Sequence, residues 1–371
     1  MITRAQVIKL RPSRPQERLL SMTAGASRFA YNWALERHQK RYKEGEGFDP
    51  FQISRDWTQE RPEWSKQVSG HALRQALVNA SAAYTNFFKH KTKYPKFHKK
   101  GCKDSFYCLN DRTKFTGKSV KLEKLGTIHT FEPVRFTDAH LLGATVVRKA
   151  DGWYIIPQFE MYEIEPRTTS TSVVGVDVGC AHWATASDGT VLDEPKKVKH
   201  LRRLLRRRQR LASRKARGSA NQKKAYRRVS RLYQRIDNVK KDAIHKFTAS
   251  IAKNHGLVVI EDLDIAGMKK KASPSIRRGV QYSAMQEIHR QLMYKCNQYM
   301  KVDRYYPSSK TCSNCGSIKE DLSISDRTYQ CHSCDHTMDR DLNASLNLMK
   351  EGLKLITEGH SGRDCGDSSK A

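Results

Sequence analysis

Two pairs of cysteines constrain this chain more than any other feature. CSNCG at 312–316 and CHSC at 331–334 each place two cysteines two residues apart, and fifteen residues separate the pairs. Each CxxC turn presents two thiolates to one ion, and a spacer of this length lets two turns face each other, as in a zinc ribbon. His332 and His336 are alternative ligands, but four cysteines complete a closed structural shell. We predict a zinc ribbon over 308–335, with the ligands Cys312, Cys315, Cys331 and Cys334.

The net charge limits the partners of the chain. Its 371 residues hold 69 Lys and Arg against 38 Asp and Glu, a formal charge of +31. A charge this large implies a polyanionic partner, either nucleic acid or an anionic membrane surface. No apolar run approaches a membrane span, and MITRAQVIKLRP lacks the apolar stretch of a signal peptide. We expect a soluble cytoplasmic protein that binds nucleic acid and no membrane.

Much of this charge lies in residues 196–246, which carry 21 Lys and Arg against two Asp. Leucines and valines at helical spacing predict two helices here, broken near Gly218. A charge run is often only a solvated helix face. The density favours a track for a phosphate backbone instead. Candidate contacts are Arg206, Arg207, Arg210, Arg214 and Arg228.

The first 165 residues mix strands and helices. ITRAQVIKL predicts a strand, and Ser13 with Gln16 forms a capping box for a helix that runs towards Gly45. A second helix follows from the apolar spacing of Leu73, Leu77 and Tyr84. Residues 105–161 are then rich in β-formers, with a clear hairpin at Asp151-Gly152. We predict a β-barrel from 1–11 and 104–165 that carries an inserted helical domain, 12–103.

The remaining residues alternate buried strands and helices, which is typical of an α/β domain. VVGVDVG and LVVIEDL are the buried strands, and HWATASDGTVL predicts a hairpin at Asp188-Gly189. GMKKKASPSIRRG predicts a mobile basic loop, YSAMQEIHRQLMYKCNQYM a helix, and VDRYYP the final strand. We expect a linker at 163–172 and a disordered tail at 356–371.

Acidic residues interrupt the two buried strands. Asp177 lies within VVGVDVG and Glu261 ends LVVIE, where a carboxylate is costly unless it is paired or binds a cation. Taken singly, Asp177 can be a turn residue and Glu261 the partner of a basic helix. Together with DRD at 339–341 they indicate a divalent-metal site, because carboxylate oxygens suit Mg²⁺ or Mn²⁺. Two such ions can activate water against a phosphodiester, so the pattern favours a nuclease.

The order of these motifs resembles that of a known family. GVDVG, the basic helical pair, VVIEDL, SSKTCSNCG to CHSC, and DRDLNASLN stand as they do in TnpB proteins of the OrfB type, the transposon-encoded relatives of type V CRISPR nucleases. SRFAYNWAL, YPKFHKK and CGDSS extend the resemblance over nearly the whole chain. Ser345 replaces a second alanine found in many members, a change between small residues. SIRRGVQYSAMQEI matches only by position.

The resemblance implies a RuvC-like, RNase H-type nuclease domain at 170–307 and 336–355, into which the zinc ribbon is inserted. A wedge-like β-barrel with a helical recognition domain would precede it. Carried over by position, the three catalytic and Mg²⁺-binding (or Mn²⁺-binding) acids are Asp177, Glu261 and Asp341. Asp339 lies roughly 200° away around the helix, so we expect it to cap the helix or to hold a basic neighbour.

The resemblance also implies the partners and the reaction. A guide RNA from the same element would pair with one strand of a double-stranded DNA target, while the protein reads a short adjacent motif. No obligate protein partner is expected. Side chains that can address base edges lie along the second helix, although an ordinary solvated face explains them equally well: His71, Arg74, Gln75 and Asn79.

Two other functions remain open. A nuclease-dead, RNA-guided repressor would lack at least one acid, whereas all three are present here. A transposase acting directly on element ends would give strand-transfer products and not plain cleavage.

Overall fold

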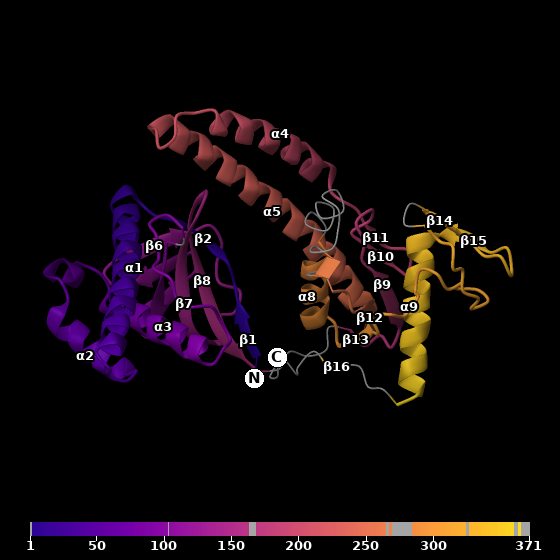
Figure 1. Ribbon diagram of the computed structural model, residues 1–371, viewed down its shortest axis with the longest axis horizontal. Coiled ribbons are helices and arrows are strands. Elements are labelled where there is room, and N and C mark those ends of the chain that lie inside the picture. The colour runs from indigo at the N-terminus through magenta and orange to yellow at the C-terminus, as the bar shows by residue number, and fades with distance from the viewer. Residues whose placement is uncertain are drawn as a thin grey trace. The chain divides into compact units, whose positions relative to one another are not determined.

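The computed structural model describes residues 2–102, 104–162, 168–264, 267–268, 284–323, 326–359 and 363–364 (Figure 1). The chain divides into two compact units, Met1–Glu163 and Ile164–Ala371. No helix among the described residues combines the length and the apolar character needed to cross a membrane. The predicted basic loop GMKKKASPSIRRG lies almost wholly outside the described residues.

Helices of the first unit follow the predicted signals, with two additions. The helix α1 (Arg14–Lys43) begins at the predicted capping box, because the Ser13 side chain accepts a bond from the Gln16 backbone and the Gln16 side chain accepts one from the Ser13 backbone. The second predicted helix is α3 (Gly70–Phe88). Between them lie α2 (Pro50–Glu60) and a 3₁₀ turn, η1 (Glu63–Gln67), which were not predicted. Only Ile53 and Trp57 of α2 are buried, so its apolar pattern is short.

The strands of the first unit pair antiparallel in the order β3-β7-β8-β2-β6-β5-β4, and β1 also pairs with β8. Pairing of Lys149 with Gly152 confirms the predicted hairpin. Among the described residues no pairing joins the two ends of this path, so barrel closure stays a prediction. The strands are β1 (Ile2–Ala5), β2 (Ile8–Arg11), β3 (Ser105–Leu109), β4 (Thr113–Thr116), β5 (Ser119–Leu122), β6 (Gly126–Thr130), β7 (His140–Lys149) and β8 (Gly152–Met161).

A mixed sheet in the order β11-β10-β9-β12-β13-β16 forms the centre of the second unit. The strands β9, β12 and β13 are parallel, whereas β10, β11 and β16 run antiparallel to their neighbours. The α/β class is therefore confirmed. Its strands are β9 (Val173–Asp177), β10 (Ala184–Ala186), β11 (Val191–Leu192), β12 (Leu257–Glu261), β13 (Gln298–Val302) and β16 (Arg363–Asp364).

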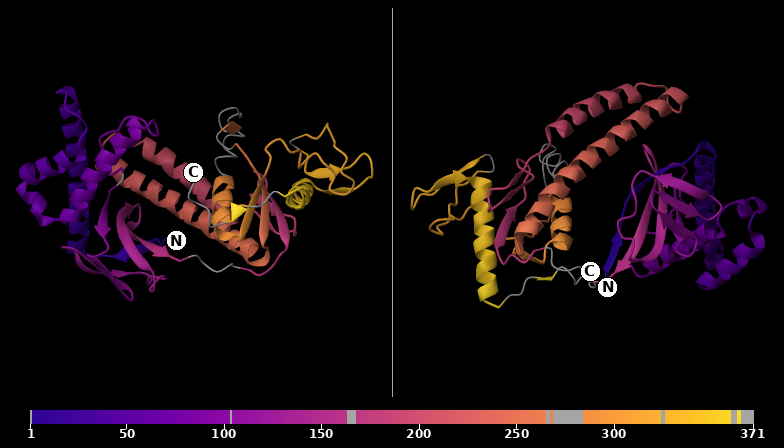
Figure 2. Two further views of the ribbon diagram at one scale, coloured as in Figure 1. Left: turned by 90° about the horizontal axis from the view of Figure 1, so that it is seen from below. Right: turned by 180° about the vertical axis from the view of Figure 1, so that it is seen from behind.

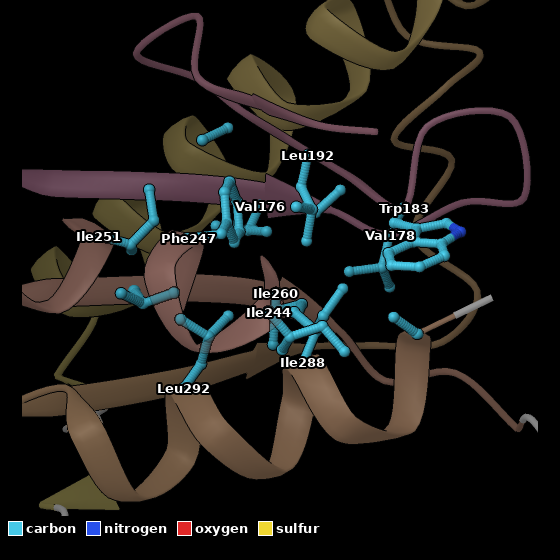
Figure 3. Packing of buried hydrophobic residues seen from close by; sticks show 14 of the residues in the cluster. Val176, Val178, Trp183, Leu192, Ile244, Phe247, Ile251, Ile260, Ile288 and Leu292 are labelled. Atoms are coloured by element: carbon cyan, nitrogen blue, oxygen red, sulfur yellow. The ribbon is translucent and has the colours of Figure 1, made fainter. Parts of the chain in front are cut away.

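Helices cover both faces of this sheet. Val176 and Ile260 pack with the end of α5 (Ala220–Asn254) and with α8 (Met285–Lys295), as Figure 3 shows. The alternate strand positions, such as Val259, pack on α9 (Arg340–Thr357) instead. Because successive side chains of a strand point to opposite faces, α9 covers the face opposite α5 and α8 (Figures 1 and 2).

The basic segment folds as predicted into an antiparallel pair of helices, α4 (Lys196–Ser213) and α5, with Gly218 at positive φ between them. This pair has its own apolar core, which includes Leu201, Leu205 and Ile236. The length of α5 therefore has two uses, because its first part packs on α4 and its last part packs on the sheet.

Three boundaries in the C-terminal part differ from the predictions. The helix α8 ends at Lys295, and the last parallel strand is Gln298–Val302 and not VDRYYP, because Tyr299 and Met300 point to the cores on opposite faces of the sheet. The ribbon hairpin of β14 (Thr328–Gln330) and β15 (Thr337–Asp339) continues past the predicted limit at residue 335. Within the predicted tail, α9 runs on to Thr357 and β16 pairs with β13.

Candidate active site and zinc ribbon

The first two predicted acids end neighbouring parallel strands. Val176 of β9 pairs with Ile260 of β12, so Asp177 and Glu261 are the next residues on adjacent strands and lie level with each other. Val176 and Ile260 face α5 and α8, so the alternation directs both carboxylates to the face covered by α9. The strand pattern alone therefore brings two acids to the same end of two neighbouring strands. They lie on the face covered by α9, the helix that carries the third acid.

Close packing of α9 on β9 places the third acid. A Cβ atom added at Gly175 would collide with the carbonyl oxygen of Ser345 and the backbone nitrogen of Met349, so only glycine permits this approach. Ser345 is fully buried, and its hydroxyl donates to the carbonyl of Leu342 at 2.7 Å. The replacement of alanine by Ser345 is thus accommodated, and the first turn of α9 carries Asp341 towards the strand ends.

Electrostatics link the three acids. Burial raises the pKa of Asp177 to about 7, and the nearby carboxylates of Asp341 and Glu261 contribute to this rise, against the opposing effects of Arg340 and the Val178 amide. Burial also raises the pKa of Glu261. Like charges gathered in a partly buried place are costly unless a cation or protons neutralise them. The structure therefore brings the predicted acids into one electrostatic cluster.

Asp262, the residue next to Glu261, differs from the three acids because it forms ion pairs. Asp262 pairs with Lys301 at 2.8 Å and with Arg304 at 3.4 Å, and these cations hold its pKa below the usual range. No such ion pair forms at Glu261 within the described residues. The alternative role of Glu261, partner to a basic helix, therefore finds no support in this part of the chain.

Asp339 has a different role from Asp341. Its carboxylate accepts bonds from the backbone nitrogens of Asp341 at 2.9 Å and Leu342 at 3.0 Å, which makes it the N-cap of α9. This confirms the predicted capping role. The capped turn holds Asp341 at the first turn of the helix, near the strand ends.

The four predicted cysteines form a compact cluster. Their sulfur atoms all lie within 4.8 Å of one another, with 3.7 Å between Cys312 and Cys334 and 3.6 Å between Cys315 and Cys331. Tetrahedral zinc with bonds of about 2.3 Å to sulfur requires about 3.8 Å between its ligands. The residues present therefore fit a closed Zn²⁺ shell.

The described residues offer no second cluster this tight, and the three carboxylates are more widely spaced. The three carboxylates therefore do not form a compact shell like that of the cysteines.

Local structure supports the cysteine cluster. Gly316 follows the first knuckle at φ +79°, a conformation that glycine adopts without strain. Tyr329 is fully buried against Cys312 and Cys331 and donates its hydroxyl proton to the carbonyl of Lys310. A hydrogen bond with Ser317 lowers the pKa of Cys331 to about 5, which favours the thiolate form that binds metal.

Two asparagines that the sequence reasoning passed over join the ribbon to α9. Asn343 and Asn347 are buried one turn apart, and their amides bond the backbone on both sides of Cys312. A signal was present, because two amides at i and i+4 share one side of a helix and need hydrogen-bond partners where that side is buried. Arg340 adds a bond from its guanidinium to the carbonyl of Ser323 in the ribbon.

The predicted nucleic-acid contacts fall on exposed surfaces. On α3, Arg74 and Asn79 are exposed and His71 and Gln75 half-buried, with the Gln75 amide donating to Asn79 at 3.1 Å. The arginines predicted on the helical pair are all exposed: Arg206, Arg207, Arg210, Arg214 and Arg228. Tyr226 and Tyr233, seven residues apart on α5, are also exposed by nearly half and were not predicted.

Family models match three parts of the chain. Residues 157–272 match the OrfB (IS605) family model, described as a probable transposase, and residues 286–348 match the TNB domain of Cas12f1-like proteins. A helix-turn-helix model matches residues 1–47, which here form β1, β2 and α1.

Full-length relatives are also found. "Putative RNA-guided DNA endonuclease InsQ" of Escherichia coli K12 is 31% identical, and the match covers 95% of this chain and 92% of that protein. A "Putative RNA-guided DNA endonuclease" of Streptomyces pristinaespiralis is 32% identical over 100% of this chain and 94% of its own length. A solved structure of CasPhi-2 (Cas12j) bound to crRNA is 11% identical, with a TM-score of 0.47, and the match covers 95% of this chain and 98% of that one.

Proposed function

The chain belongs to the TnpB family, and we propose from this membership that it is an RNA-guided, metal-dependent DNA endonuclease. One structural observation supports the proposal most directly. Asp177 and Glu261 lie level at the ends of neighbouring strands, and Asp341 is close enough to raise the pKa of Asp177. A repressor without nuclease activity has no need for three mutually repelling acids. Their retention favours the nuclease.

Asp177, Glu261 and Asp341 are the residues that would hold Mg²⁺ or Mn²⁺. When bound, these ions activate a water molecule and stabilise the leaving oxygen of a phosphodiester. The carboxylates supply hard oxygen ligands, and Asp339 fixes the turn that carries Asp341. With its pKa raised to about 7, Asp177 would have to lose a proton to hold a cation at or below neutral pH.

The nucleic-acid partners follow from charge and family. Relatives carry names that specify RNA-guided DNA endonucleases, and the +31 charge of this chain suits a large polyanion. We infer that guide RNA from the same element pairs with the DNA target, and that the arginines of the α4–α5 pair follow a phosphate backbone. For the adjacent DNA motif, the exposed side of α3 remains our candidate, with His71, Arg74, Gln75 and Asn79.

The domain roles are part of the same proposal. Strands of the first unit would form the wedge-like barrel and α1 to α3 the recognition domain, while the mixed sheet with α5, α8 and α9 would form the RuvC-like nuclease domain. The ribbon would hold one structural Zn²⁺ on Cys312, Cys315, Cys331 and Cys334. Its closed shell leaves no position for substrate, so the chemistry belongs to the acids.

The proposal is tested with the RNA that copurifies with the protein. The RNA is sequenced, and the complex is incubated in Mg²⁺ with plasmids that carry the matching target beside a randomised sequence. We expect double-strand cleavage only of matched plasmids that share one adjacent motif, and none in EDTA. Binding of matched plasmids without cleavage would favour the repressor, and joined DNA ends would favour the transposase. Either result contradicts the proposed function.

A further inference from the structure

The ribbon and the third acid share α9, and buried amides connect them. Asn343 is fully buried and uses both ends of its amide, because its Nδ2 donates to the carbonyl of Thr311 at 2.7 Å and its Oδ1 accepts from the nitrogen of Ser313 at 2.9 Å. Thr311 and Ser313 flank the zinc ligand Cys312. The Asn343 side chain therefore holds the backbone on both sides of one metal ligand.

The next turn of α9 extends this connection. The Nδ2 of Asn347, 2% exposed, donates to the carbonyls of Ser308 at 2.8 Å and Thr311 at 2.6 Å. The ammonium of Lys350 bonds the carbonyl of Ser313. Three side chains on successive turns thus hold the first zinc knuckle against one side of the helix.

The second half of the ribbon reaches the same helix through the backbone. Strand β15 ends at Asp339, and α9 starts at the next residue. Arg340 donates its backbone N–H to the carbonyl of Arg327 at 2.9 Å, and its guanidinium bonds the carbonyl of Ser323. The first knuckle and the second half of the ribbon are therefore both attached to α9, whose first turn carries Asp341.

We propose that Asn343 and Asn347 are positioning residues for the nuclease reaction, through which the zinc-bound ribbon fixes the place of Asp341 in the divalent-metal site. The physical reason is that a buried amide loses its partners if the knuckle moves, so the knuckle and the helix turn shift together. Bound zinc would fix the first knuckle, and the asparagines would hold α9 against it. The carboxylate of Asp341 would thereby be held in place. This inference rests on the proposed function of the three acids.

The test separates zinc binding from assembly of the acidic site. The full-length variants Asn343→Ala and Asn347→Ala are compared with Gln291→Ala, which removes a similarly buried amide where α5 packs on α8, on the other face of the sheet. Zinc content is measured by elemental analysis. Binding of Mn²⁺, a spectroscopic substitute for Mg²⁺, is measured by electron paramagnetic resonance without guide or target.

We expect the asparagine variants to keep one zinc per chain while their Mn²⁺ affinity falls about 10- to 100-fold. A loss of this size is usual when a residue that orients a metal ligand is removed. The control variant Gln291→Ala should keep both the zinc content and the Mn²⁺ affinity of the wild type. Chelation of zinc should weaken Mn²⁺ binding in the wild type and add little in Asn343→Ala, because one connection has already been broken. Asn347→Ala leaves the Asn343 bonds intact and provides the test if Asn343→Ala does not fold.

Unchanged Mn²⁺ affinity in a zinc-loaded asparagine variant would overturn the inference. Loss of zinc from both variants would also overturn it, because the amides would then only stabilise the ribbon. Since the Mn²⁺ measurement uses no nucleic acid, a wild type that binds Mn²⁺ at the acids but cuts no matched DNA would contradict the proposed function alone.

Discussion

The cysteine cluster and the acidic cluster of the second unit are built in opposite ways. Four sulfur atoms lie within 4.8 Å of one another, on two knuckles within residues 312–334. The acids come from β9, β12 and α9, three elements separated in sequence, and their carboxylates are farther apart. The geometry of one cluster fits a closed shell around a single ion, whereas the other cluster is open.

This difference indicates how each cluster is stabilised. Soft thiolates gain free energy from zinc itself, so zinc binding would add to the hydrogen bonds that hold the ribbon together. The Asp341 and Glu261 carboxylates help to raise the pKa of Asp177, and the three acids depend on the packed sheet and on α9 to remain together. A structural site can thus be local in sequence, whereas an open catalytic site requires the whole fold.

The largest effect is expected from neutralising an acid. Asp177→Asn and Glu261→Gln keep the side-chain shapes but remove charged ligands, so guide-directed cleavage should fall by roughly 10³-fold, comparable to the removal of one group that stabilises the charge of a transition state. Gel-based cleavage kinetics at saturating Mg²⁺ measure this loss. Asp262→Asn, at an adjacent ion-paired position, is the matched control and should remain active. Equal activity in all three variants would show that the acidic cluster is not the active site.

Breaking the ribbon should have the next largest effect. Cys331→Ser removes one thiolate, so we expect loss of zinc and rapid proteolysis within residues 308–339, with cleavage of DNA reduced as a consequence. Elemental analysis and limited proteolysis with mass spectrometry report the two changes. Cys102→Ser changes an exposed thiol in the first unit and should alter neither. Retention of zinc in Cys331→Ser would contradict the four-cysteine shell.

These two experiments also show why the sequence predicts the two clusters unequally. CxxC spacing predicts all four cysteines of the cluster, because a knuckle is a local structure. For the acids, the buried strands suggested Asp177 and Glu261, but Asp341 was chosen over Asp339 only through the family resemblance. The physical distinction comes from the cap that Asp339 forms and from the approach of α9 to Gly175, and both are seen only in three dimensions.

Other predictions succeeded or failed for the same reason. The capping box at Ser13 and the turn at Gly189 are local signals, and both are present in the structure. The strand at Gln298–Val302 was assigned in large part to a helix, because only Tyr299, Met300 and Val302 are buried in it and so short a pattern has no clear period. Asn343 and Asn347 were missed because their partners lie 30 or more residues away in sequence.

The pH dependence of metal binding sharpens the contrast further. With a pKa of about 7, Asp177 keeps its proton below neutral pH, so Mg²⁺ affinity should fall by about tenfold per pH unit below 7. Isothermal titration from about pH 5.5 to 8.5, on either side of this pKa, measures the slope. Affinity that is independent of pH in this window would contradict a buried, mutually repelling acid cluster.

The same pKa predicts the stability of the metal-free protein. Between the ordinary Asp pKa of about 3.9 and 7, the folded state holds a proton that the unfolded state has lost. The free energy of unfolding should therefore decrease as pH rises through this range. Asp177→Asn should weaken this decrease and raise the melting temperature in EDTA at about pH 8, above the folded-state pKa. A lower melting temperature in Asp177→Asn under these conditions would contradict the assigned direction of the pKa shift.

The smallest effect is expected on the α4–α5 pair. Replacing Arg206, Arg207, Arg210 and Arg214 by glutamine should leave folding intact, because all four are exposed. The slope of log affinity for nucleic acid against log salt should become shallower by about 0.7 to 0.9 for each phosphate that the variant no longer neutralises. Filter binding at several salt concentrations measures the slope. Lys354→Gln, outside the pair, should leave it unchanged, and an unchanged slope in the arginine variant would make the pair a merely solvated surface.

The most direct test of the central claim compares two aspartates that lie two residues apart. Asp341→Asn removes the proposed metal ligand, whereas Asp339→Asn keeps an oxygen that can cap α9. Both variants are assayed with copurified guide RNA and matched plasmid in Mg²⁺. The predicted result is loss of cleavage in Asp341→Asn with zinc retained, and cleavage near the wild-type rate in Asp339→Asn. Full cleavage by Asp341→Asn would contradict a three-acid active site at the ends of β9, β12 and the start of α9.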